Sequence, residues 1–238
     1  MKKRITISID EELLRKLGPN KSRAIEEILR KVVMEKPEKA IVLAGGSGGE
    51  RCLKEVDGKS ILEWNLSLLK RYGVEKVLIA LDKKGRRIKE KFGDGRMFGV
   101  SLSYVEEEKP LGTGGAIGNA KYFIDETCLV IYGDNYAEID LEKFYQFHKK
   151  SGAMITIALK SLPEAKKYGN VLLEGNKVVK FVEKPKEVVS NIVSTGVFLI
   201  EPEVVERCRG SFEREVIPEF VEECKVYGYV FPGRWIEV

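Results

Sequence analysis

The spacing of hydrophobic residues divides the chain into two parts. From residue 40 onward, continuous apolar segments alternate with segments of helical spacing. The expected strands are 40–45, 77–81, 101–105, 128–134 and 154–159, and the expected helices are 61–72, one from about 85, one from about 111, and 141–150. Apolar strands between helices are typical of a parallel sheet covered on both faces. The pattern therefore predicts a mainly parallel α/β domain over residues 38–238.

The first 37 residues have a different pattern. Three isoleucines alternate with Arg4, Thr6 and Ser8, which is the period of a strand with one buried face. Asp10 is the expected N-cap of a first helix, and Ser22 is the expected cap of a second helix after a Gly-Pro-Asn break. So short a segment cannot bury its own apolar residues. We therefore expect a homodimer formed through this strand, with residues 34–38 as the linker.

Composition and charge narrow the class of protein. The 238 residues carry a net charge of +4, and the first 38 hold ten Lys or Arg against seven Asp or Glu. No apolar segment is long enough to span a membrane and the N-terminus lacks a secretion signal, so we expect a cytoplasmic protein without a membrane partner. Four cysteines stand singly with one histidine, His148, which argues against a zinc site and a disulfide framework.

Glycines follow several of the predicted strands. Residues 42–59 read VLAGGSGGERCLKEVDGK, an apolar run that ends in a glycine pair and then brings arginine and lysine. Glycine lets a ligand approach the main chain, so such a loop is a candidate phosphate cradle, although it matches no common phosphate motif. Further glycines stand at 112–115, and Gly133 precedes Asp134. Because ligands of parallel sheets bind at the carboxyl ends of strands, we expect these segments to meet in one site.

These motifs together resemble a known enzyme family. Five motifs occur in the order and spacing of the sugar-1-phosphate nucleotidyltransferases: LAGG, LGTGGAIGNA, YGDN, FVEKP and SNIVSTGVF. The resemblance covers residues 39–238. It implies a GT-A-like, Rossmann-like doubly wound α/β sheet. It also implies that NMP is transferred from an NTP to a sugar-1-phosphate with Mg²⁺, which releases pyrophosphate and forms an NDP-sugar.

The resemblance assigns roles to individual residues. The nucleotide-binding residues it implies are Leu43, Ala44, Gly45, Gly46, Gly112, Thr113 and Gly114. The sugar-phosphate residues it implies are Gly169, Glu183, Lys184 and Thr195, with Lys184 also neutralising the phosphate in catalysis. Asp134 corresponds to a Mg²⁺ ligand, and an oxygen ligand suits this hard cation. Glu237 stands where the family usually has a second metal-binding aspartate.

The glycine-rich loop departs from the family pattern. Members of the family typically carry an arginine soon after the second glycine and a separate lysine before the V-x-G-K turn. Here Arg51 fits either position, so the loop is shortened and one residue stands where two cations are expected. Lys54 either supplies the missing catalytic charge or is a surface residue. Slow catalysis, altered substrate choice and lost activity all remain open.

The N-terminal segment resembles the ribbon-helix-helix family. That resemblance implies that Arg4, Thr6 and Ser8 read DNA bases from a strand in the major groove. An alternative is that the unit only dimerises the protein. Under the DNA hypothesis, the chain is a regulator whose degenerate nucleotidyltransferase domain senses a nucleotide or a sugar nucleotide, and the regulatory and enzymatic functions can also coexist.

Overall fold

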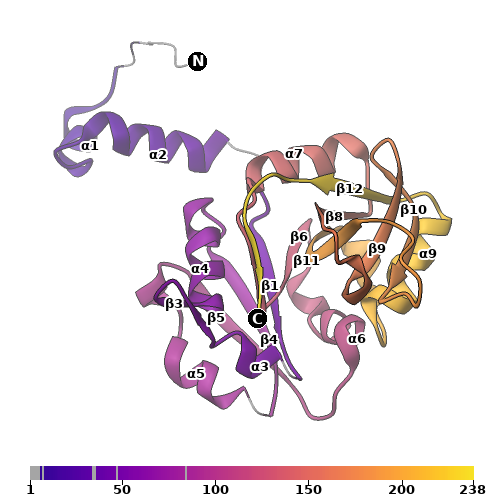
Figure 1. Cartoon of the computed structure of the whole chain (residues 1–238). Coiled ribbons are helices and arrows are strands. Elements are labelled where there is room, and N and C mark those ends of the chain that lie inside the picture. Colours follow the sequence, from indigo (N-terminus) through magenta and orange to yellow (C-terminus); the bar gives the residue numbers. More distant parts are fainter. Residues whose placement is uncertain (1–5, 7, 34–35, 47, 84) are drawn as a thin grey trace. The chain divides into compact units, whose positions relative to one another are not determined.

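The chain forms two compact units, Met1–Glu35 and Lys36–Val238. The structure is a computed structural model that describes residues 6, 8–33, 36–46, 48–83 and 85–238 (Figure 1). Within these residues, no helix is both long enough and apolar enough to cross a membrane.

The N-terminal unit contains two helices, α1 (Glu11–Lys16) and α2 (Lys21–Val33). Asp10 caps α1 as expected, because its side chain accepts a hydrogen bond from the backbone of Glu12 at 2.8 Å. The expectation that Ser22 caps the second helix is wrong: α2 already begins at Lys21, so Ser22 lies inside it, and Asn20 Oδ1 accepts from Arg23 N at 3.4 Å. Thr6, Ser8 and Ile9 lie in no strand, and Arg4, Ile5 and Ile7 fall outside the described residues. Strand pairing with a second copy stays a prediction.

A nine-stranded sheet, in the order β5-β4-β1-β6-β11-β8-β12-β10-β9, forms the centre of the second unit. Its strands are β1 (Lys39–Ala44), β4 (Lys76–Asp82), β5 (Ser101–Glu107), β6 (Cys128–Tyr132), β8 (Ile155–Ser161), β9 (Gly169–Glu174), β10 (Lys177–Glu183), β11 (Ile192–Ile200) and β12 (Val226–Val230). Two small sheets pair β2 (Glu55–Val56) with β3 (Lys59–Ser60), and β7 (Asn135–Ala137) with β13 (Trp235–Glu237). The strands predicted from continuous apolar runs are therefore present within one or two residues of their expected ends.

Helices cover both faces of this sheet, as the apolar strands predicted. They are α3 (Gly48–Arg51), α4 (Ile61–Arg71), α5 (Arg86–Phe92), η1 (Arg96–Phe98), α6 (Gly112–Asn119), η2 (Lys121–Phe123), α7 (Leu141–Ser151), η3 (Ala165–Lys167), α8 (Pro202–Val205), η4 (Phe212–Val216) and α9 (Ile217–Glu222). Strand β1 shows why two layers form. Ala40 and Val42 join the core that includes residues of α4, α5 and α7, while Ile41 and Leu43 join the core of α6 and α9.

The sheet is mixed rather than parallel throughout. Strands β5, β4, β1 and β6 are parallel neighbours, as the alternation of strands and helices predicted. Strand β11 runs antiparallel to both β6 and β8, and β10 runs antiparallel to β12 and β9. The hairpin of β9 and β10 has no helical crossover between its strands, so it can only pair antiparallel. The parallel prediction therefore holds for the first half of the sheet.

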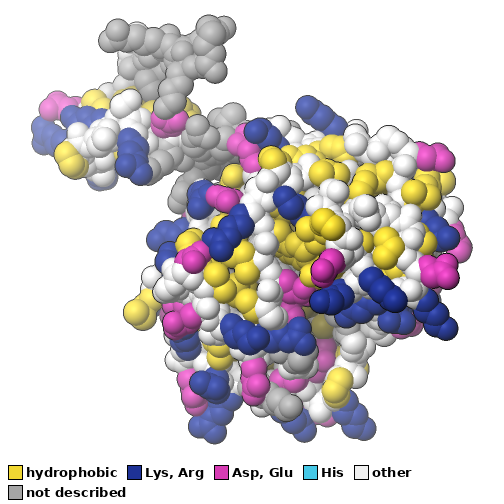
Figure 2. Space-filling model, in the orientation of Figure 1, with side chains coloured by type: hydrophobic (Ala, Val, Ile, Leu, Met, Phe, Trp, Pro, Cys, Tyr) yellow, Lys and Arg dark blue, Asp and Glu magenta, His cyan; other side chains and the backbone are white. Residues whose placement is uncertain are grey.

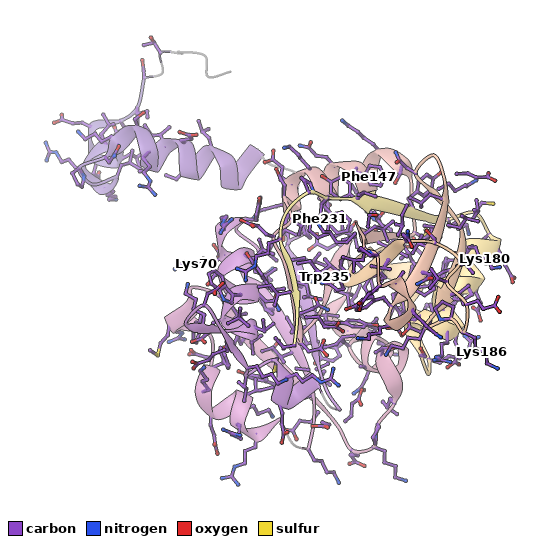
Figure 3. All side chains as sticks on the ribbon, in the orientation of Figure 1. Lys70, Phe147, Lys180, Lys186, Phe231 and Trp235 are labelled. Atoms are coloured by element: carbon purple, nitrogen blue, oxygen red, sulfur yellow. The ribbon has the colours of Figure 1, made fainter. Side chains whose placement is uncertain are left out.

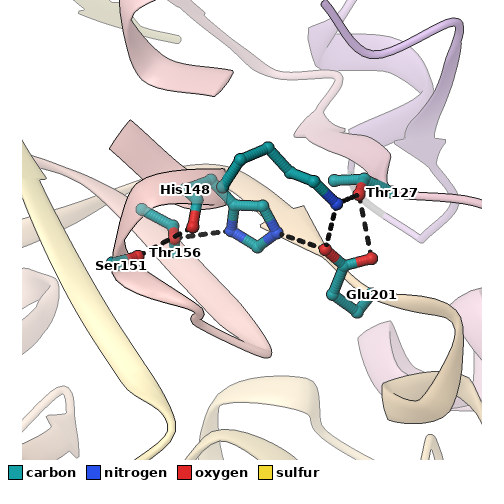
Figure 4. A network of polar contacts seen from close by, with 6 residues as sticks. Thr127, His148, Ser151, Thr156 and Glu201 are labelled. Carbon is teal, nitrogen blue, oxygen red and sulfur yellow. Dashed lines mark hydrogen bonds and ion pairs between the residues drawn. The ribbon is translucent and has the colours of Figure 1, made fainter. Parts of the chain in front are cut away.

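A buried polar network ties four elements together at the amino ends of β6 and β8 (Figure 4). His148 on α7 lies 2.7 Å from the Thr156 hydroxyl through Nδ1 and 3.1 Å from Glu201 Oε1 through Nε2. Lys149 and Thr127 also donate to the carboxylate of Glu201, at 2.9 and 2.8 Å. The one histidine of the chain thus has a structural partner on each ring nitrogen.

Candidate functional site

A cavity of about 550 Å³ lies at the carboxyl ends of the parallel strands and extends along β10 and β11. Figure 2 shows the domain from the side that carries the C-terminus, with acidic side chains near its middle and Lys and Arg side chains spread around them. The cavity is lined by Leu43, Gly45, Gly46, Arg51, Ala80, Glu107, Pro110, Gly112, Thr113, Ala116, Tyr132, Asp134, Asn135, Lys167, Tyr168, Gly169, Glu183, Lys184, Ser194, Thr195, Gly196, Phe198, Ser211, Glu213, Arg214, Trp235 and Glu237. All but three of the residues predicted for nucleotide, sugar, metal and catalysis lie along it.

The glycine-rich loop forms the wall after β1. Gly46 has a φ of +60° and donates its backbone N–H to Asp82 Oδ2 at 3.0 Å, which fixes the turn out of the strand. The short helix α3 follows and ends at Arg51, whose Nη1 lies 3.2 Å from Asp134 Oδ2. The shortened loop therefore brings its arginine directly to the aspartate expected to bind metal.

The next wall is the N-terminus of α6. Gly112 has a φ of +79°, and a Cβ there would lie 2.3 Å from the carbonyl oxygen of Gly210. The Thr113 hydroxyl donates to Glu213 Oε2 at 2.7 Å and accepts from Phe212 N at 2.9 Å. The glycine-rich sequence of this helix thus lets its first turn pack backbone to backbone against the segment before η4.

Asp134 and Glu237 are neighbours through their backbones. In the β7 and β13 pair, Glu237 is opposite Asn135, and Val238 N donates to Asp134 O at 3.1 Å. This pairing carries the C-terminal segment across the middle of the domain, where Trp235 lies (Figure 3). Both carboxylates line the cavity, and their oxygens are the ligands that Mg²⁺ prefers. The described residues hold no group of three or more His, Cys, Asp or Glu that could by itself bind a metal ion, so Mg²⁺ binding by this pair stays a prediction.

The end of β10 forms the opposite wall. Lys184 has a φ of +47°, which is uncommon for a non-glycine residue and is often found at functional positions. Its Nζ lies 3.8 Å from Glu183 Oε1, and its side chain is exposed whereas that of Glu183 is buried for the most part. Gly169 is required here, because a Cβ would lie 2.9 Å from Glu183 Oε2 and 2.5 Å from the ring of Phe181.

Strand β11 contributes its middle rather than its end. Its register with β8 shifts between Ser194 and Phe198, which turns Thr195 and Gly196 toward the cavity. The Thr195 hydroxyl donates to the carbonyl of Ala158 at 2.8 Å, so its proton is used within the protein. Thr195 therefore shapes the wall and has acceptor lone pairs to offer a ligand.

Three predicted site residues do not line the cavity. Ala44 is fully buried in the core beneath the loop, because side chains alternate along β1. Lys54 is exposed after α3 and does not line the cavity, so its role as the second catalytic cation stays a prediction. Gly114 N donates to Gly210 O at 2.9 Å, and a Cβ would lie 2.3 Å from Arg209 O. Gly114 is thus needed for packing, and its contact with a nucleotide stays a prediction.

The predicted DNA-reading residues can be placed only in part. Thr6 and Ser8 are exposed, and Arg4 lies outside the described residues. DNA binding stays a prediction.

Several lining residues were missed by the sequence analysis. Among the described residues, five buried side-chain polar atoms lack a hydrogen-bond partner, and four of them belong to cavity residues: Glu107, Tyr132, Asn135 and Trp235. Buried polar groups are normally paired, so this cluster indicates a site that a polar ligand completes. Asn135, within YGDN, and Glu107, two residues after a predicted strand, could have been found by their positions. Glu213 and Arg214 come from a distant segment and had no such signal.

Burial changes the acidity of the cavity carboxylates. It raises the pKa of Glu183, against the opposing charges of Lys184 and Arg214. It likewise raises the pKa of Glu213, although the Thr113 hydroxyl opposes the shift. Burial and then the hydrogen bond to Glu237 raise the pKa of Tyr168, so its hydroxyl stays a donor at the C-terminal edge of the cavity.

Comparisons with known proteins agree with this geometry. The model of the nucleotidyl transferase family matches residues 39–238. Over 82% of its length the chain is 32% identical to mannose-1-phosphate guanylyltransferase of Mycobacterium tuberculosis, and it spans 59% of that protein. It is 30% identical to D-glycero-alpha-D-manno-heptose 1-phosphate guanylyltransferase of Aneurinibacillus thermoaerophilus, over 84% of this chain and 92% of that one.

The fold is shared with solved structures. The crystal structure of HddC from Yersinia pseudotuberculosis superposes with a TM-score of 0.72 at 24% identity, and covers 84% of this chain and 92% of that one. That protein has also been solved in complex with GMP-PN. The match to the family model spans the whole sheet and every wall of the cavity. The chain therefore belongs to the nucleotidyl transferase family.

Proposed function

We propose that the chain is a Mg²⁺-dependent nucleotidyltransferase that transfers NMP from an NTP to a sugar-1-phosphate, forming an NDP-sugar and pyrophosphate. The observation that carries the proposal is the convergence of the glycine-rich loop, Asp134 and the Glu183–Lys184 pair on one cavity whose buried polar atoms lack partners. The names of the relatives, which act on mannose 1-phosphate and a heptose 1-phosphate, support a sugar phosphate of this kind as the acceptor.

The charges around the cavity support the need for a metal ion. The described lining residues include five carboxylates, those of Glu107, Asp134, Glu183, Glu213 and Glu237, and four cations. Two phosphorylated substrates would therefore enter a site without net positive charge. A divalent cation held by Asp134 and Glu237 would supply the missing charge and polarise the phosphate oxygens.

Side chains of the cavity would bind and neutralise the phosphates and hold the sugar. Arg51, next to Asp134, is positioned to stabilise negative charge on the transferred phosphate. Lys184 would neutralise the phosphate of the incoming sugar, and its unusual backbone angle fixes where the side chain leaves the strand. Glu183 would accept hydrogen bonds from sugar hydroxyls. Bringing the two substrates into one orientation is then the main contribution of the cavity.

The test is pyrophosphate release from each of GTP, ATP, CTP, UTP and dTTP with mannose 1-phosphate, glucose 1-phosphate and D-glycero-α-D-manno-heptose 1-phosphate. We expect release with at least one pair, dependent on Mg²⁺ and abolished by EDTA. Asp134→Asn should lower the rate by at least about 100-fold, because it weakens the metal site. The matched control is Asp125→Asn, which alters an exposed aspartate paired with Lys39. No release with any pair by a folded protein would refute the proposal.

A further inference from the structure

Arg214 is a cation of the cavity whose charge is not neutralised by an ion pair within the described residues. Four described cations line the cavity. Two of them, Arg51 and Lys184, lie 3.2 and 3.8 Å from a carboxylate oxygen. The side chains of Arg214 and Lys167 are exposed, and neither makes an ion pair in the part of the chain that the structure describes. These two side chains therefore keep their charge and their N–H donors for a ligand.

The backbone that carries Arg214 is held firmly in place. It belongs to η4, a single π-helical turn in which Phe212 and Val216 are fully buried and anchor the turn in the core. Ser211 caps the turn, because its hydroxyl accepts a hydrogen bond from Arg214 N at 3.2 Å. Single π-helical turns are rare and frequently occur at functional sites. Arg214 thus leaves a turn whose position is fixed, and its side chain lines the cavity.

The turn joins two walls of the cavity. It packs against α6, where the Thr113 hydroxyl accepts a hydrogen bond from Phe212 N at 2.9 Å, and against β10, which ends at Glu183. The charge of Arg214 acts on that end of β10. Burial raises the pKa of Glu183, and the charges of Lys184 and then Arg214 oppose this shift. Arg214 therefore lies between the wall expected to hold the nucleotide and the wall expected to hold the sugar phosphate.

We propose that Arg214 binds the phosphate of the sugar-1-phosphate together with Lys184, so that cations from two distant segments hold the acceptor. The inference rests on the proposed function. A phosphate monoester carries close to two negative charges at neutral pH, more than a single lysine neutralises. The planar guanidinium of an arginine can donate two parallel hydrogen bonds to phosphate oxygens, whereas Lys184 offers a point charge. Arg51 would then serve the transferred phosphate of the nucleotide.

Steady-state kinetics of the full chain separates the two substrates. The acceptor is whichever of mannose 1-phosphate, glucose 1-phosphate and D-glycero-α-D-manno-heptose 1-phosphate gives the fastest release of pyrophosphate. Arg214→Gln should raise the KM for this acceptor roughly 10- to 100-fold, because one charge-assisted contact is lost, and leave the KM for the NTP within about 2-fold. Arg214→Lys should recover part of the loss, since it keeps the charge but not the fork. The matched control is Arg87→Gln, because Arg87 is an exposed arginine of α5 that does not line the cavity.

Titration calorimetry provides a readout without catalysis. The same sugar-1-phosphate is titrated into the full chain saturated with Mg²⁺ and a non-hydrolysable analogue of the NTP. Arg214→Gln should weaken binding by a factor similar to the rise in KM. Its remaining affinity should also fall less steeply with added salt than that of the unaltered protein, because one screened charge contact is missing. A merely structural role of Arg214 would leave this salt dependence unchanged.

The outcomes separate this inference from the proposed function. An unchanged KM for the sugar-1-phosphate in Arg214→Gln would overturn the inference while leaving nucleotidyl transfer standing. A larger effect on the KM for the NTP would also overturn it, because Arg214 would then serve the nucleotide. Lys167→Gln is the competing variant: if it alone raises the KM for the acceptor, Lys167 is the second phosphate-binding cation. Absence of pyrophosphate release by the unaltered, folded protein would instead be a failure of the proposed function.

Discussion

At the scale of single residues, the decisive feature is the pair of Arg51 and Asp134. Their side chains are 3.2 Å apart across the cavity, and both are partly exposed to it. In the described part of the glycine-rich loop, no other cation lines the cavity, since Lys54 and Lys59 do not. We therefore expect Arg51 to carry the charge that two residues share in the family pattern. Removing the charge of Arg51 should therefore lower the catalytic rate more than removing a surface charge does.

Arg51→Gln should lower the rate of pyrophosphate release by roughly 100- to 1,000-fold, because one oriented donor to the transferred phosphate is lost. Arg51→Lys should restore part of the rate, since it keeps the charge but not the planar fork. Rates are measured at saturating substrates and Mg²⁺. Lys54→Ala is the matched control and should stay within about 2-fold of the unaltered protein. A Lys54→Ala effect as large as that of Arg51→Gln would restore Lys54 as the second catalytic cation.

At the scale of elements, packing between distant segments holds the walls of the cavity in place. The first turn of α6 meets Gly210 backbone to backbone, and β13 pairs with β7 to bring the C-terminal segment beside Asp134. At the other end of the sheet, Glu201 joins α7 to the start of β6 through His148, Lys149 and Thr127 (Figure 4). This network lies away from the cavity, so it should affect stability and not substrate binding.

Stability should depend on the ionisation of Glu201 in acid. Burial by itself would raise the pKa of this carboxyl, but hydrogen bonds from His148, Lys149 and Thr127 outweigh burial and lower the pKa to about 2. A carboxylate whose pKa is depressed on folding stabilises the fold above its unfolded value, about 4.5. That stability is lost as the pH falls from about 4.5 toward 2. After allowance for solvent screening, we expect roughly 1–2 kcal/mol.

Urea unfolding of Glu201→Gln measures this contribution. The variant should be less stable than the unaltered protein by that amount at pH 7, and the difference should shrink as the pH falls below about 4.5. Glu206→Gln, an exposed change on the same connection, is the control. A difference that stays constant between pH 7 and pH 3 would show that the charge of Glu201 is not what stabilises the network.

At the scale of the whole molecule, the two units differ in how far they bury their own apolar residues. Residues 36–238 enclose two cores on either side of the sheet. In the N-terminal unit, Leu13, Ile28 and Leu29 are 56%, 48% and 45% exposed. A segment this short cannot cover such residues alone, which supports the proposal that it dimerises with a second copy of the chain.

Removal of residues 1–35 should yield a monomer that still unfolds cooperatively and keeps pyrophosphate release within about 3-fold. Light scattering coupled to size exclusion at micromolar concentration should give twice the chain mass for the full protein. A full-length monomer under these conditions would refute the dimer. An inactive but folded 36–238 fragment would show that the N-terminal unit contributes to catalysis.

Some features of this protein were determined by the sequence itself. Continuous apolar runs located β1, β4, β6 and β8, because a strand that is buried on both faces must be apolar on both, whereas the edge strand β5 is partly exposed. The order of glycine-rich and charged motifs located twelve of the 27 residues that line the cavity in the described part of the chain. Both signals are local: each depends on residues that are close together in the chain.

Other features were decided only by the tertiary structure. Three of these features depend on which distant segments pack together. They are the antiparallel course of β10 and β11, the exclusion of Lys54 and Gly114 from the cavity, and the position of Glu213 beside Thr113. The unpaired oxygen of Glu107 belongs to the same group, since burial and pairing are properties of the packed molecule. Residue type and spacing determine which elements form, whereas the cavity depends on contacts between segments that are far apart in the sequence.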